Sequence, residues 1–478
     1  MTRTLSRMAW SCACALVASI GTCQAQESLP FVLGHLALDL TVDYQRGTIG
    51  GTAALRVRNL GDRPAAEIPL LLNRLMTVSH VAAEDGTEMP FGQRVVLFRD
   101  DSIRQVNAIM VTPRTPVPPG DSLSIIVRFS GFLVGYTETG SLYIKDHVSR
   151  DFTILREDAF AFPLLGVPSW SVNRAAPREP FTFAARVTVP ADLVVAMGGA
   201  QVERTARDSV ITWGYRSTGP VPFLNITIAP YSVLERGETR IFYFPADSSG
   251  AHTVQQAIAG ALERYAAWFG PLGQSPRLTV MEIPEGYGSQ ASLTAGILQT
   301  ADAFRDRSEL RQLYHELSHL WNVPDREHPS PRWNEGLASF LERRMAADLD
   351  GWSDWDAHLD AIAQRMRRGC AAPVRCDSVP FAAYGQAGLT DLSYSVGDAL
   401  FYSLYQVLGP DTFDRAYRGF YQKYRDAGAS SADLVASFHR TDPRGDVIFA
   451  DWFSTTRWYA RLSAGESIAR QIDSYKRR

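Results

Sequence analysis

Apolar side chains alternate with other residues along several stretches of the first half of the chain, which is the period of a half-buried β-strand. The clearest alternating runs are residues 36–42, 123–129 and 181–189. Glycine and proline interrupt the pattern, and we expect turns at 50–51, 118–121 and 198–199. Strands that follow one another without long helices predict an antiparallel β domain, saddle-like or sandwich-like, over residues 26–236.

The pattern changes to the helical period after about residue 237. Short strands are predicted at 240–244 and 278–283, with a helix at 253–269 between them, and most of the remaining chain is helical. One amphipathic helix carries a stripe of four apolar residues: Leu400, Leu404, Val407 and Leu408. Gly409, followed by proline, ends this helix. The fold class is therefore α+β and multidomain, with a mainly helical second domain at 237–478.

The most specific chemistry lies in residues 314–320, where two histidines stand four positions apart. On a helix, His315 and His319 lie on one face, so both imidazoles reach one metal ion. Glu316 then stands beside a metal-bound water, and Glu335 from the next helix supplies a third ligand. Three protein ligands with a fourth position open are typical of a catalytic site with one Zn²⁺ ion.

A surface helix with two ordinary histidines is the simpler interpretation of this segment. It is disfavoured because the flanking residues are apolar and aromatic, and the polar groups of a half-buried helix need partners. A metzincin site would need glycine and histidine where Asn322 and Asp325 stand, so that pattern fails. We interpret His328 as a loop residue, and Glu342 as a solvated surface residue rather than a partner of a zinc histidine.

The composition and the N-terminal residues limit the kinds of partner and the cellular compartment that we expect for the protein. The chain has 478 residues and a net charge of −3, which gives no indication of a nucleic-acid or polyanion partner. Residues 1–25 resemble a secretory signal, since Arg3 and Arg7 precede an apolar run and Ala25 offers a cleavage site. A retained anchor and a lipoprotein modified at Cys23 are the alternatives. We expect an exported protein, periplasmic, secreted or envelope-associated, with no membrane span after the signal.

The five cysteines divide into two groups. Cys12, Cys14 and Cys23 lie within the predicted signal. Cys370 and Cys376 stand six positions apart in a loop with glycine and proline. In an oxidising compartment we expect these two to form a disulfide, with two free thiols as the alternative.

Four stretches resemble the alanyl aminopeptidase (aminopeptidase N) family of gluzincins. They are the opening strands at 35–52, the zinc helix at 315–321, the second zinc motif at 333–339, and residues 394–397. The resemblance implies an N-terminal β domain joined to a thermolysin-like zinc catalytic domain. It also implies that Glu316 is the general base and that Tyr394 donates to the oxyanion. Residues 319–323 look like the glycyl aminopeptidases as well.

Two departures from this family bear on the site. Glu335 follows His319 by 16 residues, a few fewer than is usual. The family's Gly-x-Met-Glu-Asn strand, whose glutamate grips the substrate amine, is missing, and Glu282 and Glu285 are the candidate substitutes. A short segment in its place is expected to form an edge strand that pairs with the substrate backbone: Gly288, Ser289, Gln290 and Ala291.

The leading hypothesis from the sequence is an exported, aminopeptidase-like zinc metallopeptidase that acts on a peptide or protein substrate. Exopeptidase and endopeptidase action both stay open, because the amine anchor is missing. A peptide-binding or scaffold protein on the same fold is the alternative from another class. A zinc hydrolase of a non-peptide substrate is the third possibility.

Overall fold

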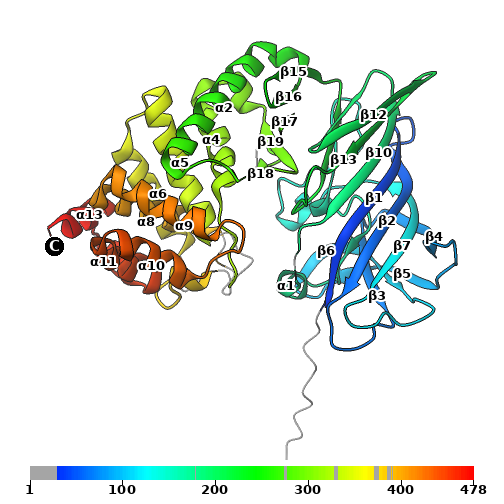
Figure 1. Cartoon of the computed structure of the whole chain (residues 1–478), viewed down its shortest axis with the longest axis horizontal. Coiled ribbons are helices and arrows are strands. Elements are labelled where there is room, and N and C mark those ends of the chain that lie inside the picture. Colours follow the sequence, from blue (N-terminus) through cyan, green and yellow to red (C-terminus); the bar gives the residue numbers. More distant parts are fainter. Residues whose placement is uncertain are drawn as a thin grey trace, which may run out of the picture.

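The computed structural model describes residues 29–477, apart from 178, 274–276, 328–331, 371–375, 385–388 and 390. A β half and a helical half lie side by side, with a small mixed sheet between them (Figure 1). The signal expected at 1–25 and the loop residue His328 lie outside the described residues. The expected order, a β domain followed by a mainly helical domain, is confirmed.

Three sheets of the described chain build the β half around one hydrophobic core. The largest has the order β12-β13-β10-β1-β2-β7-β4 and is antiparallel except between β1 and β10, which run parallel. The other two have the orders β5-β6-β3-β9 and β11-β14-β8. The strands are β1 (Phe31–Asp43), β2 (Thr48–Asn59), β3 (Ile68–Leu72), β4 (Met76–Ala83), β5 (Phe91–Phe98), β6 (Asp101–Val111), β7 (Ser122–Phe132), β8 (Thr153–Arg156), β9 (Leu164–Leu165), β10 (Thr182–Pro190), β11 (Val194–Ala196), β12 (Ala200–Arg207), β13 (Val210–Arg216) and β14 (Asn225–Ala229).

The predicted alternation is visible in β1, where Leu36, Leu38, Leu40 and Val42 are all buried. The turn expected at 50–51 is wrong, because both glycines lie inside β2 and pair with β1. A Cβ atom on Gly51 would lie 2.0 Å from the carbonyl oxygen of Asp39. Glycine is therefore required here for a close approach of two strands, which a sequence cannot distinguish from a turn.

A five-stranded mixed sheet, in the order β15-β16-β17-β19-β18, opens the second half of the molecule. Its strands are β15 (Ser232–Arg236), β16 (Thr239–Tyr243), β17 (Leu278–Ile283), β18 (Gln290–Ser292) and β19 (Gly296–Thr300). The domain boundary expected at 236/237 falls in the turn between β15 and β16, and it stays a prediction. β18 pairs only with β19 among the described strands, so it is the edge strand of this sheet.

The helices of the second half pack around a second core. Helix α2 connects β16 to β17 along the chain. Helix α8 ends at Leu408, as the apolar stripe and Gly409 predicted. The helices are α2 (Ser248–Phe269), α3 (Asp302–Arg305), α4 (Leu310–Ser318), α5 (Arg332–Asp350), α6 (Trp355–Gly369), α8 (Leu392–Leu408), α9 (Pro410–Tyr424), α10 (Ser431–Thr441), α11 (Asp446–Phe449), α12 (Arg457–Ser463) and α13 (Ile468–Lys476), with a short α1 (Trp170–Ala175) in the β half. Among the described helices, none is both long enough and apolar enough to cross a membrane.

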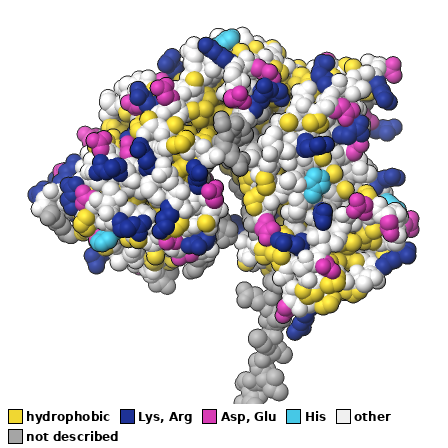
Figure 2. Space-filling view, viewed as in Figure 1, with side chains coloured by type: hydrophobic (Ala, Val, Ile, Leu, Met, Phe, Trp, Pro, Cys, Tyr) yellow, Lys and Arg dark blue, Asp and Glu magenta, His cyan; other side chains and the backbone are white. Residues whose placement is uncertain are grey.

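The β half holds the segment that leads into β18. The guanidinium of Arg156 donates to the carbonyl oxygen of Tyr287 at 2.9 Å. The amide of Asn225 donates to Gln290 at 2.9 Å, and Gln290 in turn donates to Asp158 at 3.2 Å. These bonds fix the edge strand relative to the helices, at the notch that separates the two halves in Figure 2.

Candidate metal centre

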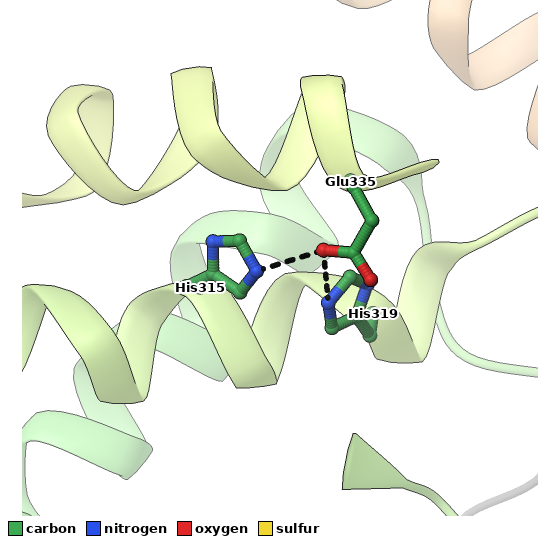
Figure 3. Close-up of side chains that lie close together, drawn as sticks. All are labelled: His315, His319 and Glu335. Atoms are coloured by element: carbon green, nitrogen blue, oxygen red, sulfur yellow. Dashed lines mark hydrogen bonds and ion pairs between the residues drawn. The ribbon is translucent and has the colours of Figure 1, made fainter. Parts of the chain in front are cut away.

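Helix α4 carries His315, the 3-10 turn that directly continues it begins at His319, and α5 brings a carboxylate to both histidines (Figure 3). Nε2 of His315 lies 3.1 Å from Oε2 of Glu335, and Nε2 of His319 lies 3.5 Å from the same oxygen. One ligand atom from each residue falls within 4.8 Å of the other two. The structure thus brings together the three side chains that the sequence predicted as one cluster.

The cluster fits a zinc ion by the chemistry and spacing of its donors. Two imidazole nitrogens and one carboxylate oxygen are a common ligand set for catalytic zinc. Donor atoms at the usual bond length from a tetrahedral zinc are about 3.4 Å apart, close to the separations of His315 and His319 from Glu335.

The outer nitrogens of both imidazoles also have partners. Nδ1 of His315 lies 3.1 Å from Oε2 of Glu342, and Nδ1 of His319 lies 2.9 Å from the side-chain amide of Asn322. Such contacts fix the orientation and tautomer of a metal-binding histidine. The interpretation of Glu342 as a solvated surface residue is wrong, because its side chain is 15% exposed. The signal was present in the sequence, seven residues after Glu335 on the same helix face.

A buried arginine holds the start of α5 and thereby compensates for the short link after the zinc helix. Arg332 is fully buried, and its guanidinium makes two hydrogen bonds to Asp325, at 2.8 Å and 2.5 Å. Asn334 donates to the carbonyl oxygen of Val323 at 3.0 Å. These contacts tie the first turn of α5 back to the end of the zinc helix, so Glu335 reaches the histidines.

A close crossing of α5 and α8 places Tyr394 at the cluster. A Cβ atom on either Gly336 or Gly397 would lie 2.4 Å from the Cα atom of the other. Only glycine allows this approach, and each glycine stands within three residues of a site residue. The ring of Tyr394 consequently lies nearly parallel to the imidazole of His315, with 6.1 Å between the ring centroids.

The carboxyl groups of the cluster differ in acidity. Burial raises the pKa of Glu316 above its ordinary value, and the charges of Glu335 and Glu342 add to this effect against the two histidines. Burial also opposes the ionisation of Glu335, but His319 and His315 outweigh it and hold its pKa well below the ordinary value. The two histidines therefore favour the ionised form of Glu335, whereas the surroundings of Glu316 disfavour its ionised form.

A cavity of about 500 Å³ opens beside the cluster and is lined by His315, Glu316 and Tyr394. Of the four residues expected to bind substrate, Gly288 and Ser289 also line it. The side chain of Gln290 is instead engaged by the β half, and Ala291 packs against the helical core. The edge strand β18 is thus present, but the cavity is lined by Gly288 and Ser289, which lead into the strand, and not by the strand itself.

Comparison with known proteins gives relatives of one kind. No family model matches the chain. Aminopeptidase M1-B of Oryza sativa subsp. japonica is 23% identical over 452 residues, which cover 86% of this chain and 48% of that protein. A mutant of the M1 zinc metallopeptidase of Deinococcus radiodurans, solved with a Tyr-Ser-Ala substrate, has a TM-score of 0.61 at 19% identity and covers 90% of this chain and 95% of that one.

The chain resembles the M1 aminopeptidases in sequence and shares their fold. The family resemblance and the fold class expected from the sequence are thereby confirmed. The chain spans about half the length of Aminopeptidase M1-B, and 20% of the length of a relative from Caenorhabditis elegans.

The M1-like site lacks the two acids that were expected to replace the amine anchor. Glu282 is fully buried on β17, where its Oε2 accepts a hydrogen bond from the backbone N–H of Phe244 at 2.6 Å. Glu285 points outward and pairs with Arg305 at 3.3 Å. Neither lines the cavity. Asp302, which the sequence analysis did not single out, does line it, and burial and a hydrogen bond with Glu285 raise its pKa.

The two remaining cysteines of this M1-like chain are joined as predicted. Cys370 and Cys376 form a disulfide, with their Cα atoms 5.5 Å apart, at the end of α6. Both side chains are buried in the helical core, and neither belongs to the metal cluster of His315, His319 and Glu335.

Proposed function

We propose that the chain is an exported zinc metallopeptidase of the aminopeptidase type, with one zinc ion held by His315, His319 and Glu335. The observation that carries this proposal is the convergence of these three donors beside a cavity. When bound, zinc supplies a Lewis acid that lowers the pKa of a coordinated water to roughly 7. The N-terminal signal pattern at 1–25 supports export.

Two residues of the chain carry the proton and the charge in the proposed hydrolysis. Glu316 accepts a proton from the attacking water and returns it to the nitrogen of the leaving amine. Its raised pKa suits both halves of this task, because the carboxyl must bind the proton and then release it. The hydroxyl of Tyr394 donates to the oxyanion that forms at the scissile carbonyl.

We further propose that the substrate is a peptide whose backbone pairs with the segment at Gly288 and Ser289, at the start of the edge strand. The Deinococcus metallopeptidase that shares this fold was solved with a Tyr-Ser-Ala substrate, which supports a short peptide. Aminopeptidase action is favoured by the named relatives.

The test compares an amino-acid amide with the same residue blocked at its amine, at measured zinc content. We expect one zinc per chain and hydrolysis of the free amine. Rapid cleavage of only the blocked substrate would make the enzyme an endopeptidase, and cleavage of neither would contradict a peptidase.

The variant Glu316→Gln tests the chemistry itself. We expect it to keep its zinc and to lose on the order of a thousandfold in kcat. Glu263→Gln is the matched control, because Glu263 is exposed on α2 and outside the cavity. Full biological function in Glu316→Gln would instead favour the scaffold alternative.

A further inference from the structure

The cavity beside the metal cluster extends to a basic wall that the proposed chemistry does not use. Arg343 comes from α5, His358 and Arg365 come from α6, and Asp398 comes from α8. These four residues line the same cavity as His315, Glu316 and Tyr394. A substrate in the cavity therefore meets this wall as well as the metal cluster.

The acids on this wall are already engaged by other residues. Glu342 lies 3.5 Å from Arg311 and 3.4 Å from Arg343, so one carboxylate is shared by two guanidinium groups. The carboxylate of Asp398 pairs with Nε2 of His358 at 2.8 Å. Neither acid neutralises Arg365.

Arg343 and Arg365 keep donors that no described residue fills. Arg343 forms no hydrogen bond with another described residue, its buried Nε included, and its guanidinium stacks 5.2 Å from the ring of Trp352. Burial lowers the pKa of Arg343, so a further negative charge beside it is favourable. Arg365 is exposed and has no hydrogen bond or ion pair within the described chain. A guanidinium offers five donors in a planar fork that matches a carboxylate.

We propose that Arg343 and Arg365 bind a carboxylate of the substrate while the scissile bond lies at the metal cluster. This inference rests on the proposed peptidase function and names the substrate class within it. Two parts of a peptide supply that group: the α-carboxylate at the C-terminus of a short peptide, and the side chain of an aspartate or glutamate. The first source makes the enzyme selective for short peptides, and the second makes it selective for acidic ones.

Two substrate pairs distinguish the sources. The tripeptide Ala-Phe-Ala is compared with its C-terminal amide, and Ala-Glu-Ala amide is compared with Ala-Gln-Ala amide. Charge-assisted hydrogen bonds predict a kcat/KM about tenfold higher for the charged member of one pair. A preference in the first pair identifies the C-terminus, and a preference in the second identifies a side chain.

The variant Arg365→Met tests whether the carboxylate of the substrate is bound by this wall of the cavity. We expect it to reduce the charged-to-neutral ratio of kcat/KM to nearly one, while the neutral substrates are cleaved as before. Arg367→Met is the matched control, because Arg367 lies on the same helix, is exposed and does not line the cavity. Arg343→Met is expected to act in the same direction.

The ratio of kcat/KM between the charged and the neutral substrate decides whether the proposal stands. The proposal stands if either charged substrate is preferred more than about threefold and this preference disappears in Arg365→Met but not in Arg367→Met. If the unmodified protein hydrolyses these peptides, any other result overturns the proposal. Calorimetric binding of the same four peptides to zinc-loaded Glu316→Gln separates this inference from the proposed function. Carboxylate-dependent binding without hydrolysis by the unmodified enzyme would overturn the function alone, and hydrolysis without carboxylate preference would overturn this inference alone.

Discussion

Glu335 in the metal cluster and Glu282 on β17 are both largely buried glutamates, yet their surroundings shift their pKa values in opposite directions. Burial opposes the charge of each, but two imidazoles face Glu335 and hold its pKa below the ordinary value. Burial raises the pKa of Glu282 to about 8, with the nearby carboxyl of Asp247 adding to the effect. Burial alone therefore does not make a carboxylate a metal ligand, and the neighbours decide which form of the group is stable.

The comparison also bears on substrate recognition. Glu282 was one of the two candidate substitutes for the missing amine anchor, but its side chain is directed away from the cavity and toward the backbone of Phe244. A protonated carboxyl in that position is a structural hydrogen-bonding group. The acids that line the cavity come from other elements: Asp302 on α3, Glu316 on α4, Glu342 on α5 and Asp398 on α8.

After Glu316→Gln, the largest expected effect on the cluster side is that of Tyr394→Phe. Loss of the hydroxyl removes one donor to the oxyanion, and kcat should fall on the order of a hundredfold or more. KM and zinc content should change little, because the ring still packs beside His315. Tyr384→Phe is a suitable control, since this buried tyrosine is not among the cavity residues. Unchanged kcat in Tyr394→Phe would assign the residue to packing.

A smaller effect is expected from Glu342→Gln, which tests whether the cluster is held by its outer partners. The substitution removes the charge that orients His315, and zinc affinity should fall about tenfold to a hundredfold. The measurement is competition with a chelator, followed by activity at saturating zinc, where most of the loss should be recovered. An affinity equal to that of the unmodified protein would mean that the contact at 3.1 Å does not tune the metal site.

The sequence predicted the cluster well because its information is local. A spacing of four on a helix places His315 and His319 on one face regardless of the rest of the fold. Glu335 was predicted from its place at the start of the next helix, whereas Tyr394 required the family resemblance. The structural reason for both positions is tertiary: the Arg332–Asp325 pair and the crossing at Gly336 and Gly397.

The sequence did not reveal the features that depend on how the surfaces of different elements pack together. Glu342 reads as an exposed helix residue until α4 is placed against it, and Asp302 and Arg365 belong to the cavity only because α3 and α6 meet there. The turn expected at 50–51 failed for the same reason, since a glycine needed for contact between strands resembles a glycine needed for a bend. The strands and helices themselves follow from periodicity, as β1, β10 and α8 illustrate.

The smallest expected effect belongs to the other carboxyl of the comparison, in the variant Glu282→Gln. In the unfolded chain this group ionises near its ordinary pKa of 4.5, whereas in the folded protein it keeps its proton to about pH 8. The folded state therefore binds more protons between these values, so stability from this group is full below about 4.5 and is lost as the pH rises through about 8. Glutamine mimics the protonated carboxyl at every pH, because its amide is uncharged and its oxygen still accepts from the N–H of Phe244.

Urea unfolding of both proteins at pH 5, 7 and 9 measures the difference between their free energies of unfolding. The contributions of all other titrating groups cancel in this difference. The variant should be close to the unmodified protein at pH 5 and more stable than it at pH 9, by on the order of 1–2 kcal/mol. A difference that is the same at all three pH values would mean that Glu282 is ionised throughout. In that case the two carboxylates would share one protonation state, and the contrast between the metal cluster and β17 would lie only in the presence of the two histidines.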